Sequence, residues 1–154
     1  DGLDRPPDLV AVPVGVGSLA EAVVRHYRQP DSARPVVLSV EPDTAACLLA
    51  SLVAGTPTTV PTSSTVMAGL NCGTLSSAAW PIMRDGCDAA VAVADTDALR
   101  AVEDLGRLGI SSGPSGASTL AGARAALADP ALRGSMDLGP DATVVLLSTE
   151  ANDR

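Results

Sequence analysis

Short apolar runs alternate with helical patterns along this sequence, and this alternation limits its fold more than any other feature. The first run, DLVAVPV at residues 8–14, lies between Pro-Pro-Asp and a glycine, which is typical of a buried strand. Further strands are predicted at residues 34–42, 88–95 and 142–149. Because helical patterns separate the strands, we expect an α/β fold: a doubly wound, mainly parallel sheet with helices on both faces.

The first helix is predicted to begin with a capping box. Ser18 is followed three positions later by Glu21, so each side chain could bond the other residue's backbone N–H. Leu19, Val23 and Tyr27 then recur on one face at helical spacing. The pattern predicts a helix that begins at Ser18 and carries these three residues on its apolar face.

The later helices are placed by their caps and by proline. Asp43 and Thr96 are the predicted N-terminal caps of the helices that follow the second and third strands. A helix over residues 76–86 is expected to be interrupted by Pro81. The last helix is predicted over residues 117–129, ending before Pro130. These boundaries rest on local patterns alone.

Length, charge and cysteine content exclude several classes of protein. A chain of 154 residues fits one α/β domain over residues 1–154, and its net charge of −8 argues against nucleic-acid binding. No apolar run reaches the roughly 20 residues of a membrane span. Cys47, Cys72 and Cys87 are too far apart for a zinc motif. We expect reduced, mostly buried thiols, no metal site, no membrane association and a cytoplasmic location.

A glycine-rich loop follows the first strand. Gly15-Val16-Gly17-Ser18 precedes a helix, so its backbone N–H groups and the helix dipole suit a phosphate ester. The alternative, of about equal weight, is a simple turn whose serine caps the helix. The loop is neither a Walker A motif, since it lacks a lysine, nor a complete GxGxxG, since position 20 is alanine.

A second glycine-serine loop opens the last long helix. Ser111, Ser112 and Ser115 could donate hydrogen bonds to a ligand, although an ordinary turn is the favoured interpretation of the pattern alone. Asn71 and Cys72 lie between glycines in the predicted loop 56–75, where a ligand-facing loop and a tight connection stay equally open. His26, the single histidine, has charged neighbours and is predicted to be a surface residue rather than a base.

The order of these pieces resembles the C-terminal half of a fold-type II pyridoxal phosphate enzyme, the tryptophan-synthase-β superfamily. Within that superfamily the chain is most similar to the diaminopropionate ammonia-lyases. The resemblance covers most of residues 7–128. Its segments are PDLVAVPVGVGSLAEAVVRHY, VVLSVEPDTAACLLASLVAG, TVMAGLNCGTLSSAAWPIMRDGCDAAVAV and GISSGPSGASTLAGARAAL.

The resemblance implies a cofactor and its ligands. Pyridoxal 5'-phosphate would place its phosphate on the loop formed by Gly15, Val16, Gly17 and Ser18. Ser115, which stands before Gly-Ala at the start of a late helix, would hydrogen-bond the pyridine nitrogen. A neutral hydroxyl partner is consistent with β-elimination from an amino acid. The superfamily also implies a homodimer.

One departure from the family is severe. The family's cofactor is held in a Schiff base by a lysine, but all ten basic residues here are arginine, which stays protonated and cannot replace it. No catalytic residue is therefore assigned. We expect the C-terminal fragment of a longer ammonia-lyase that acts on diaminopropionate or a similar amino acid. Alone it would be inactive, and it would have an apolar surface for its lysine-bearing N-terminal half or partner chain.

Two alternatives are weighed beside this hypothesis. The first is a non-catalytic module derived from the same fold, which would bind a phosphorylated metabolite or a partner protein. The second is a generic nucleotide-binding α/β domain. The three hypotheses share the fold and the phosphate loop, and they differ in which ligand that loop would bind.

Overall fold

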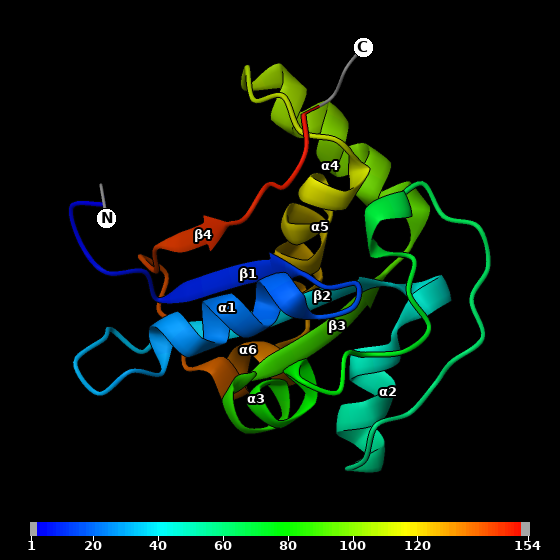
Figure 1. The fold of residues 1–154 in the computed structure, drawn as a ribbon. Coiled ribbons are helices and arrows are strands. Elements are labelled where there is room, and N and C mark those ends of the chain that lie inside the picture. Colours follow the sequence, from blue (N-terminus) through cyan, green and yellow to red (C-terminus); the bar gives the residue numbers. More distant parts are fainter. Residues whose placement is uncertain (1–2, 152–154) are drawn as a thin grey trace.

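The four strands form one parallel sheet in the order β3-β2-β1-β4. A computed structural model describes residues 3–151 of the chain (Figure 1). The register pairs Leu9 with Val36 on one side and with Val144 on the other. The strands are β1 (Leu9–Pro13), β2 (Val36–Pro42), β3 (Ala89–Val93) and β4 (Val144–Leu146).

Helices cover both faces of this sheet. Side chains of α1, α2 and α3 form one buried apolar cluster with the sheet, and those of α4, α5 and α6 form a second cluster (Figure 1). The described helices are α1 (Ser18–Tyr27), α2 (Cys47–Ala54), α3 (Ala79–Gly86), α4 (Asp95–Arg107), α5 (Pro114–Ala128) and α6 (Pro130–Met136), with short 3-10 turns at Asp43–Ala45 and Ala68–Leu70. The predicted doubly wound α/β fold is confirmed.

Alternation along the strands divides the core between the two faces. Leu9 and Ala11 of β1 lie in the cluster on the α5 face, whereas Val12 and Val14 lie in the cluster on the α1 face. Every residue of β1 is buried. A strand covered on both sides is apolar at every position, which explains why the run at 8–14 has no polar alternation.

The predicted capping box of α1 is wrong. The residue that precedes the helix is Gly17, which takes the left-handed conformation with φ 96°, and Ser18 is already helical. The Glu21 carboxylate pairs with Arg25 at 3.0 Å instead of reaching back to the helix start. The buried residues of α1 are Ala20 and Val24. The face predicted from Leu19 is therefore displaced, and Leu19 itself is 42% exposed.

Other boundaries also differ from the predictions. Asp43 opens a 3-10 turn rather than capping α2, and α4 begins at Asp95 after Ala94, ahead of the predicted cap at Thr96. Pro81 lies in the first turn of α3, where its missing N–H breaks no hydrogen bond, so it does not interrupt the helix. α5 begins at Pro114, three residues earlier than predicted.

The short helix α6 was not predicted. It begins at Pro130, and the Asp129 carboxylate caps it by accepting hydrogen bonds from the N–H groups of Ala131 and Leu132 at 2.8 and 3.1 Å. Among residues 3–151, none of the helices combines the length and apolarity that crossing a bilayer would need. The three cysteines are free thiols, as expected, although only Cys47 is fully buried.

Candidate functional site

The carboxyl ends of the parallel strands meet at one edge of the sheet, and the predicted ligand-binding loops gather there. β1 lies between β2 and β4, so the chain leaves β1 toward one side and returns much later on the other. Ligands of open α/β sheets bind in the crevice outside such a switch point. The loop of residues 14–17 leaves β1 at this edge, and α5 begins beside the segment that leaves β4.

The phosphate loop presents an open helix start. Among the described residues, no hydrogen bond is made by the N–H groups of Ser18, Leu19 and Ala20, which form the first turn of α1. The left-handed Gly17 turns the chain into the helix. The Val16 carbonyl accepts a hydrogen bond from the Ser76 N–H at 2.9 Å, which fixes the loop without using its donors. This geometry suits an anion.

Ser115 lies in the first turn of α5 and is 2% exposed. Its Oγ is buried without a hydrogen-bond partner among the residues that the structure describes. A buried hydroxyl with no partner costs free energy, so this atom is placed for a partner that the described residues do not supply. The neighbouring Ser112 hydroxyl is different, because it lies 2.8 Å from the Ser148 hydroxyl.

Gly69 connects these two parts of the site. A Cβ at Gly69 would lie 3.3 Å from Ser115 Oγ, and a Cβ at Gly15 would lie 3.1 Å from the Gly69 carbonyl oxygen. Both contacts are tighter than side chains normally make. The two glycines therefore let the phosphate loop and the Ser115 hydroxyl lie on either side of one backbone turn. The predicted phosphate loop, at Gly15, and the predicted ring ligand Ser115 thus lie next to the same turn, and their roles as cofactor ligands stay predictions.

A buried carboxyl at the same edge was missed from the sequence. Glu41 is 1% exposed and accepts hydrogen bonds from the N–H groups of Leu48 and Leu49, at 2.7 and 2.8 Å. Burial raises the pKa of the Glu41 carboxyl, and the two N–H donors oppose that rise. Burial, then the charge of Glu41, raises the pKa of the Cys47 thiol to about 12. Glu41 thus closes the start of α2, and the Cys47 sulfur stays a thiol at neutral pH.

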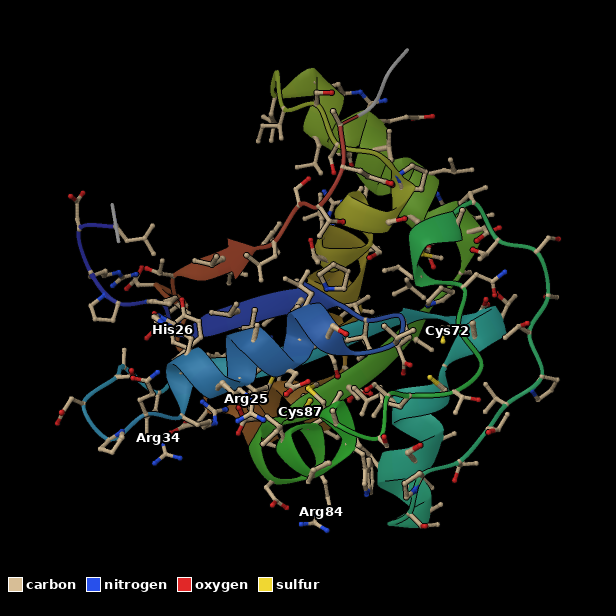
Figure 2. All side chains as sticks on the ribbon, viewed as in Figure 1. Arg25, His26, Arg34, Cys72, Arg84 and Cys87 are labelled. Atoms are coloured by element: carbon tan, nitrogen blue, oxygen red, sulfur yellow. The ribbon has the colours of Figure 1, made fainter. Side chains whose placement is uncertain are left out.

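Other candidate residues lie apart from this site or have structural partners. His26 is exposed and lies with Arg34 at the opposite, amino edge of the sheet, whereas Cys72 lies near α2 (Figure 2). The Asn71 amide donates to the Ser63 carbonyl at 3.1 Å. The Cys72 thiol donates to the Thr74 carbonyl, also at 3.1 Å. The segment around Asn71 and Cys72 is thus a connection held by its own side chains.

Comparisons with known proteins agree with this geometry. The family model "Pyridoxal-phosphate dependent enzyme" matches residues 1–150. Diaminopropionate ammonia-lyase of Escherichia coli (strain K12) is 31% identical over 158 aligned positions, which cover 95% of this chain and 39% of that protein. The chain therefore spans well under half of the length of the curated relatives that it matches.

Solved structures give the same result. A crystal structure of diaminopropionate ammonia-lyase from Escherichia coli superposes with a TM-score of 0.82 at 30% identity, over 97% of this chain and 40% of that chain. A crystal structure of threonine deaminase from T.th. gives a TM-score of 0.79 at 28% identity, over 97% of this chain and 50% of that chain. The chain belongs to the family of pyridoxal-phosphate dependent enzymes and has the fold of their fold-type II group.

Proposed function

We propose that this chain forms the cofactor-binding part of a pyridoxal phosphate-dependent ammonia-lyase. The substrate would be diaminopropionate or another small amino acid that loses an amine or hydroxyl group from its β-carbon. The relatives named above are an ammonia-lyase and a deaminase, and both names denote enzymes that remove an amino group. A single observation of the structure carries the proposal: the buried Ser115 hydroxyl, which has no hydrogen-bond partner within residues 3–151, lies beside an open phosphate loop.

The phosphate of the cofactor fits the start of α1. Its charge would lie at the positive end of the helix dipole, against the N–H groups of Ser18, Leu19 and Ala20, which bond to no other residue that the structure describes. Gly15 and Gly17 let the loop pack closely on its neighbours, because a Cβ at Gly15 would lie 3.1 Å from the Gly69 carbonyl oxygen and one at Gly17 would lie 2.7 Å from Leu75 Cδ1. These residues bind the phosphate through backbone donors, so the site needs no lysine or arginine.

The ring of the cofactor fits the Ser115 hydroxyl. A pyridine nitrogen can accept one hydrogen bond, and Ser115 Oγ is a donor without a partner in residues 3–151. When bound, pyridoxal phosphate supplies an electron sink for the electrons released at the α-carbon of an amino acid. A neutral hydroxyl holds the ring without adding a charge, which moderates that sink and suits elimination.

The chain itself supplies no amine. It contains no lysine, and arginine stays protonated at any relevant pH, so the covalent tether of the cofactor must come from another stretch of polypeptide. We propose a lysine-bearing segment or partner chain that packs against the mouth of the site. Val16 is 50% exposed and Leu19 is 42% exposed there, which gives an apolar surface for that contact.

A second candidate is a non-catalytic module that binds pyridoxal phosphate or another phosphate ester. The absence of lysine is the observation that favours it. Both candidates require ligand binding at the same loop, but only the first requires release of ammonia once a lysine-bearing segment is present.

The Ser115 hydroxyl can be tested against a matched serine. Ser115→Ala removes a group that has no partner among the described residues, so the free energy of unfolding should stay unchanged or rise by up to about 1 kcal/mol. Affinity for pyridoxal phosphate should fall about tenfold, the loss of one hydrogen bond. Ser112→Ala removes a partnered hydroxyl, so it should lower stability by about 1 kcal/mol and weaken the cofactor much less. If Ser115→Ala leaves cofactor affinity unchanged, the proposed ring site is wrong.

The lyase activity is tested by supplying the missing amine. The coding sequence directly upstream of Asp1 should be examined for a lysine-bearing segment, and that segment should be expressed together with this chain. We expect release of ammonia from 2,3-diaminopropionate, with L-serine and L-threonine assayed in parallel. A complex that binds the cofactor and releases ammonia from none of the three would favour the non-catalytic module.

A further inference from the structure

The segment that leaves β4 is hydrogen-bonded to the start of α5. The Gly113 N–H donates to the Glu150 carbonyl at 3.0 Å, and the hydroxyls of Ser148 and Ser112 lie 2.8 Å apart. The Glu150 side chain adds a third contact, because its carboxylate accepts a hydrogen bond from the Ser115 N–H at 2.7 Å. Two backbone segments that are far apart in the sequence are thus joined at the residue whose hydroxyl has no partner among the described residues.

Gly113 and Gly116 leave room for this contact between the β4 segment and α5. A Cβ at Gly113 would lie 2.5 Å from the Glu150 carboxylate oxygen Oε1. A Cβ at Gly116 would lie 2.7 Å from the hydroxyl oxygens of both Ser112 and Ser148. Real Cβ atoms do not approach so closely, so a side chain at Gly113 would displace the Glu150 carboxylate, and one at Gly116 would displace the two hydroxyls. The Glu150 carboxylate therefore occupies the space that the missing side chain of Gly113 leaves beside α5, although Glu150 itself is exposed.

The carboxylate acts on Ser115 in two ways. Its hydrogen bond fixes the backbone of Ser115, and a helical backbone restricts the rotamers that bring Oγ toward the site. Its negative charge also lies at the positive end of α5, a favourable arrangement that anchors this turn. Neither effect involves contact with the cofactor or the substrate.

We infer that Glu150 is a positioning residue that holds the Ser115 hydroxyl in place for the pyridine nitrogen. The inference rests on the proposed function, in which Ser115 binds the ring. It adds a residue from the far end of the chain to a site otherwise built from the phosphate loop and α5. It also predicts that Glu150 affects the ring of the ligand and not its phosphate.

The test uses the full chain and two probes. Pyridoxal phosphate reports on the ring and the phosphate together, whereas inorganic phosphate reports on the loop at residues 15–18 alone. Glu150→Ala should weaken pyridoxal phosphate binding about tenfold, the effect of losing one charge-assisted hydrogen bond, and should leave phosphate binding unchanged. Glu150→Gln keeps an acceptor for the Ser115 N–H and should restore most of the affinity.

Hydrogen exchange supplies a readout that is independent of ligand. The Ser115 amide should exchange faster in Glu150→Ala than in the wild type or in Glu150→Gln, while the amides of β1 keep their protection. Equal weakening of both probes, or loss of protection throughout the sheet, would show a general structural role and overturn the inference. So would unchanged pyridoxal phosphate affinity in Glu150→Ala. A wild-type chain that binds phosphate but not pyridoxal phosphate would overturn the proposed function itself, and this inference with it.

Discussion

Helices α1 and α2 both begin at the carboxyl edge of the sheet, but their first turns have different partners. At α2, the N–H groups of Leu48 and Leu49 donate to the buried Glu41 carboxylate, which reaches them from the end of β2. At α1, no described residue accepts from the N–H groups of Ser18, Leu19 and Ala20. The chain enters this helix through Gly17. The two helix starts thus lie on the same edge of the sheet, but only that of α2 has a protein carboxylate as its hydrogen-bond acceptor.

The difference separates a structural helix start from a ligand-binding one. Glu41 is 1% exposed, so its carboxyl fills the start of α2 and excludes any other anion from it. Val16, beside the start of α1, is 50% exposed, so an anion can reach the backbone donors there from solvent. In the proposed function, the cofactor phosphate does at α1 what Glu41 does at α2. The following variants test whether this division holds.

The largest effect is expected at α2. Glu41→Ala leaves the buried N–H of Leu48 and the partly buried N–H of Leu49 without an acceptor, so the free energy of unfolding should fall by about 3 kcal/mol. Urea unfolding measures it. Glu21→Ala is the matched control, since its carboxylate joins only an exposed pair with Arg25 and should cost less than about 0.5 kcal/mol. Equal losses in the two variants would mean that Glu41 is not what holds the start of α2.

The contrast between the two helix starts also explains which features the sequence could predict. Buried strands and the glycine loop are local patterns, and the structure contains both near their predicted positions. The caps predicted at Ser18, Asp43 and Thr96 were wrong, because a local sequence pattern can only propose an acceptor that stands next to the helix start in the sequence. The acceptor at α2 comes instead from Glu41 in the preceding strand, and the one at α5 comes from Glu150, 35 positions from its donor.

Some missed features had a signal in the sequence and others had none. Asp129 followed by Pro130 is typical of the start of a helix, and α6 begins there. The prediction used this proline only to end the preceding helix, α5. No such signal marks Ser115 Oγ, which is left without a hydrogen-bond partner by the described part of the chain. That lack of a partner depends on what packs around the hydroxyl, and the register of α5 against Gly69 and Glu150 is set by the tertiary structure.

A smaller effect is expected at the start of α1. Gly17→Ala forces a left-handed φ on a residue with a side chain and sets its Cβ 2.7 Å from Leu75 Cδ1, so the free energy of unfolding should fall by about 2 kcal/mol. Binding of inorganic phosphate should weaken. Gly109→Ala is the control, because Gly109 has φ 77° but open space around a Cβ. It should cost about 1 kcal/mol and leave phosphate binding intact.

If the two glycine variants lose phosphate affinity equally, the start of α1 is not the binding site, and the contrast with α2 loses its functional meaning. If Gly17→Ala is destabilised no more than Gly109→Ala, the Leu75 side chain can move aside to make room for a Cβ at position 17. Calorimetric titration and urea unfolding of the same samples separate these outcomes.

The smallest effect is the pH dependence contributed by Glu41. Burial raises the pKa of its carboxyl above the ordinary value of 4.5, so the folded state favours the neutral form. The stability that this group contributes is therefore fully present below pH 4.5 and is lost as pH rises through the folded pKa. Glu41→Gln cannot titrate, and the other carboxyl groups are common to both proteins.

The free energy of unfolding of the wild type, minus that of Glu41→Gln, should therefore decrease as pH rises from 4.5 toward neutrality. Urea unfolding at a series of pH values measures the difference. A difference that increases with pH would mean that the N–H donors of Leu48 and Leu49 outweigh burial and favour the charged carboxylate. The start of α2 would then attract negative charge as strongly as the start of α1 is proposed to do, and only the presence of Glu41 would distinguish the two.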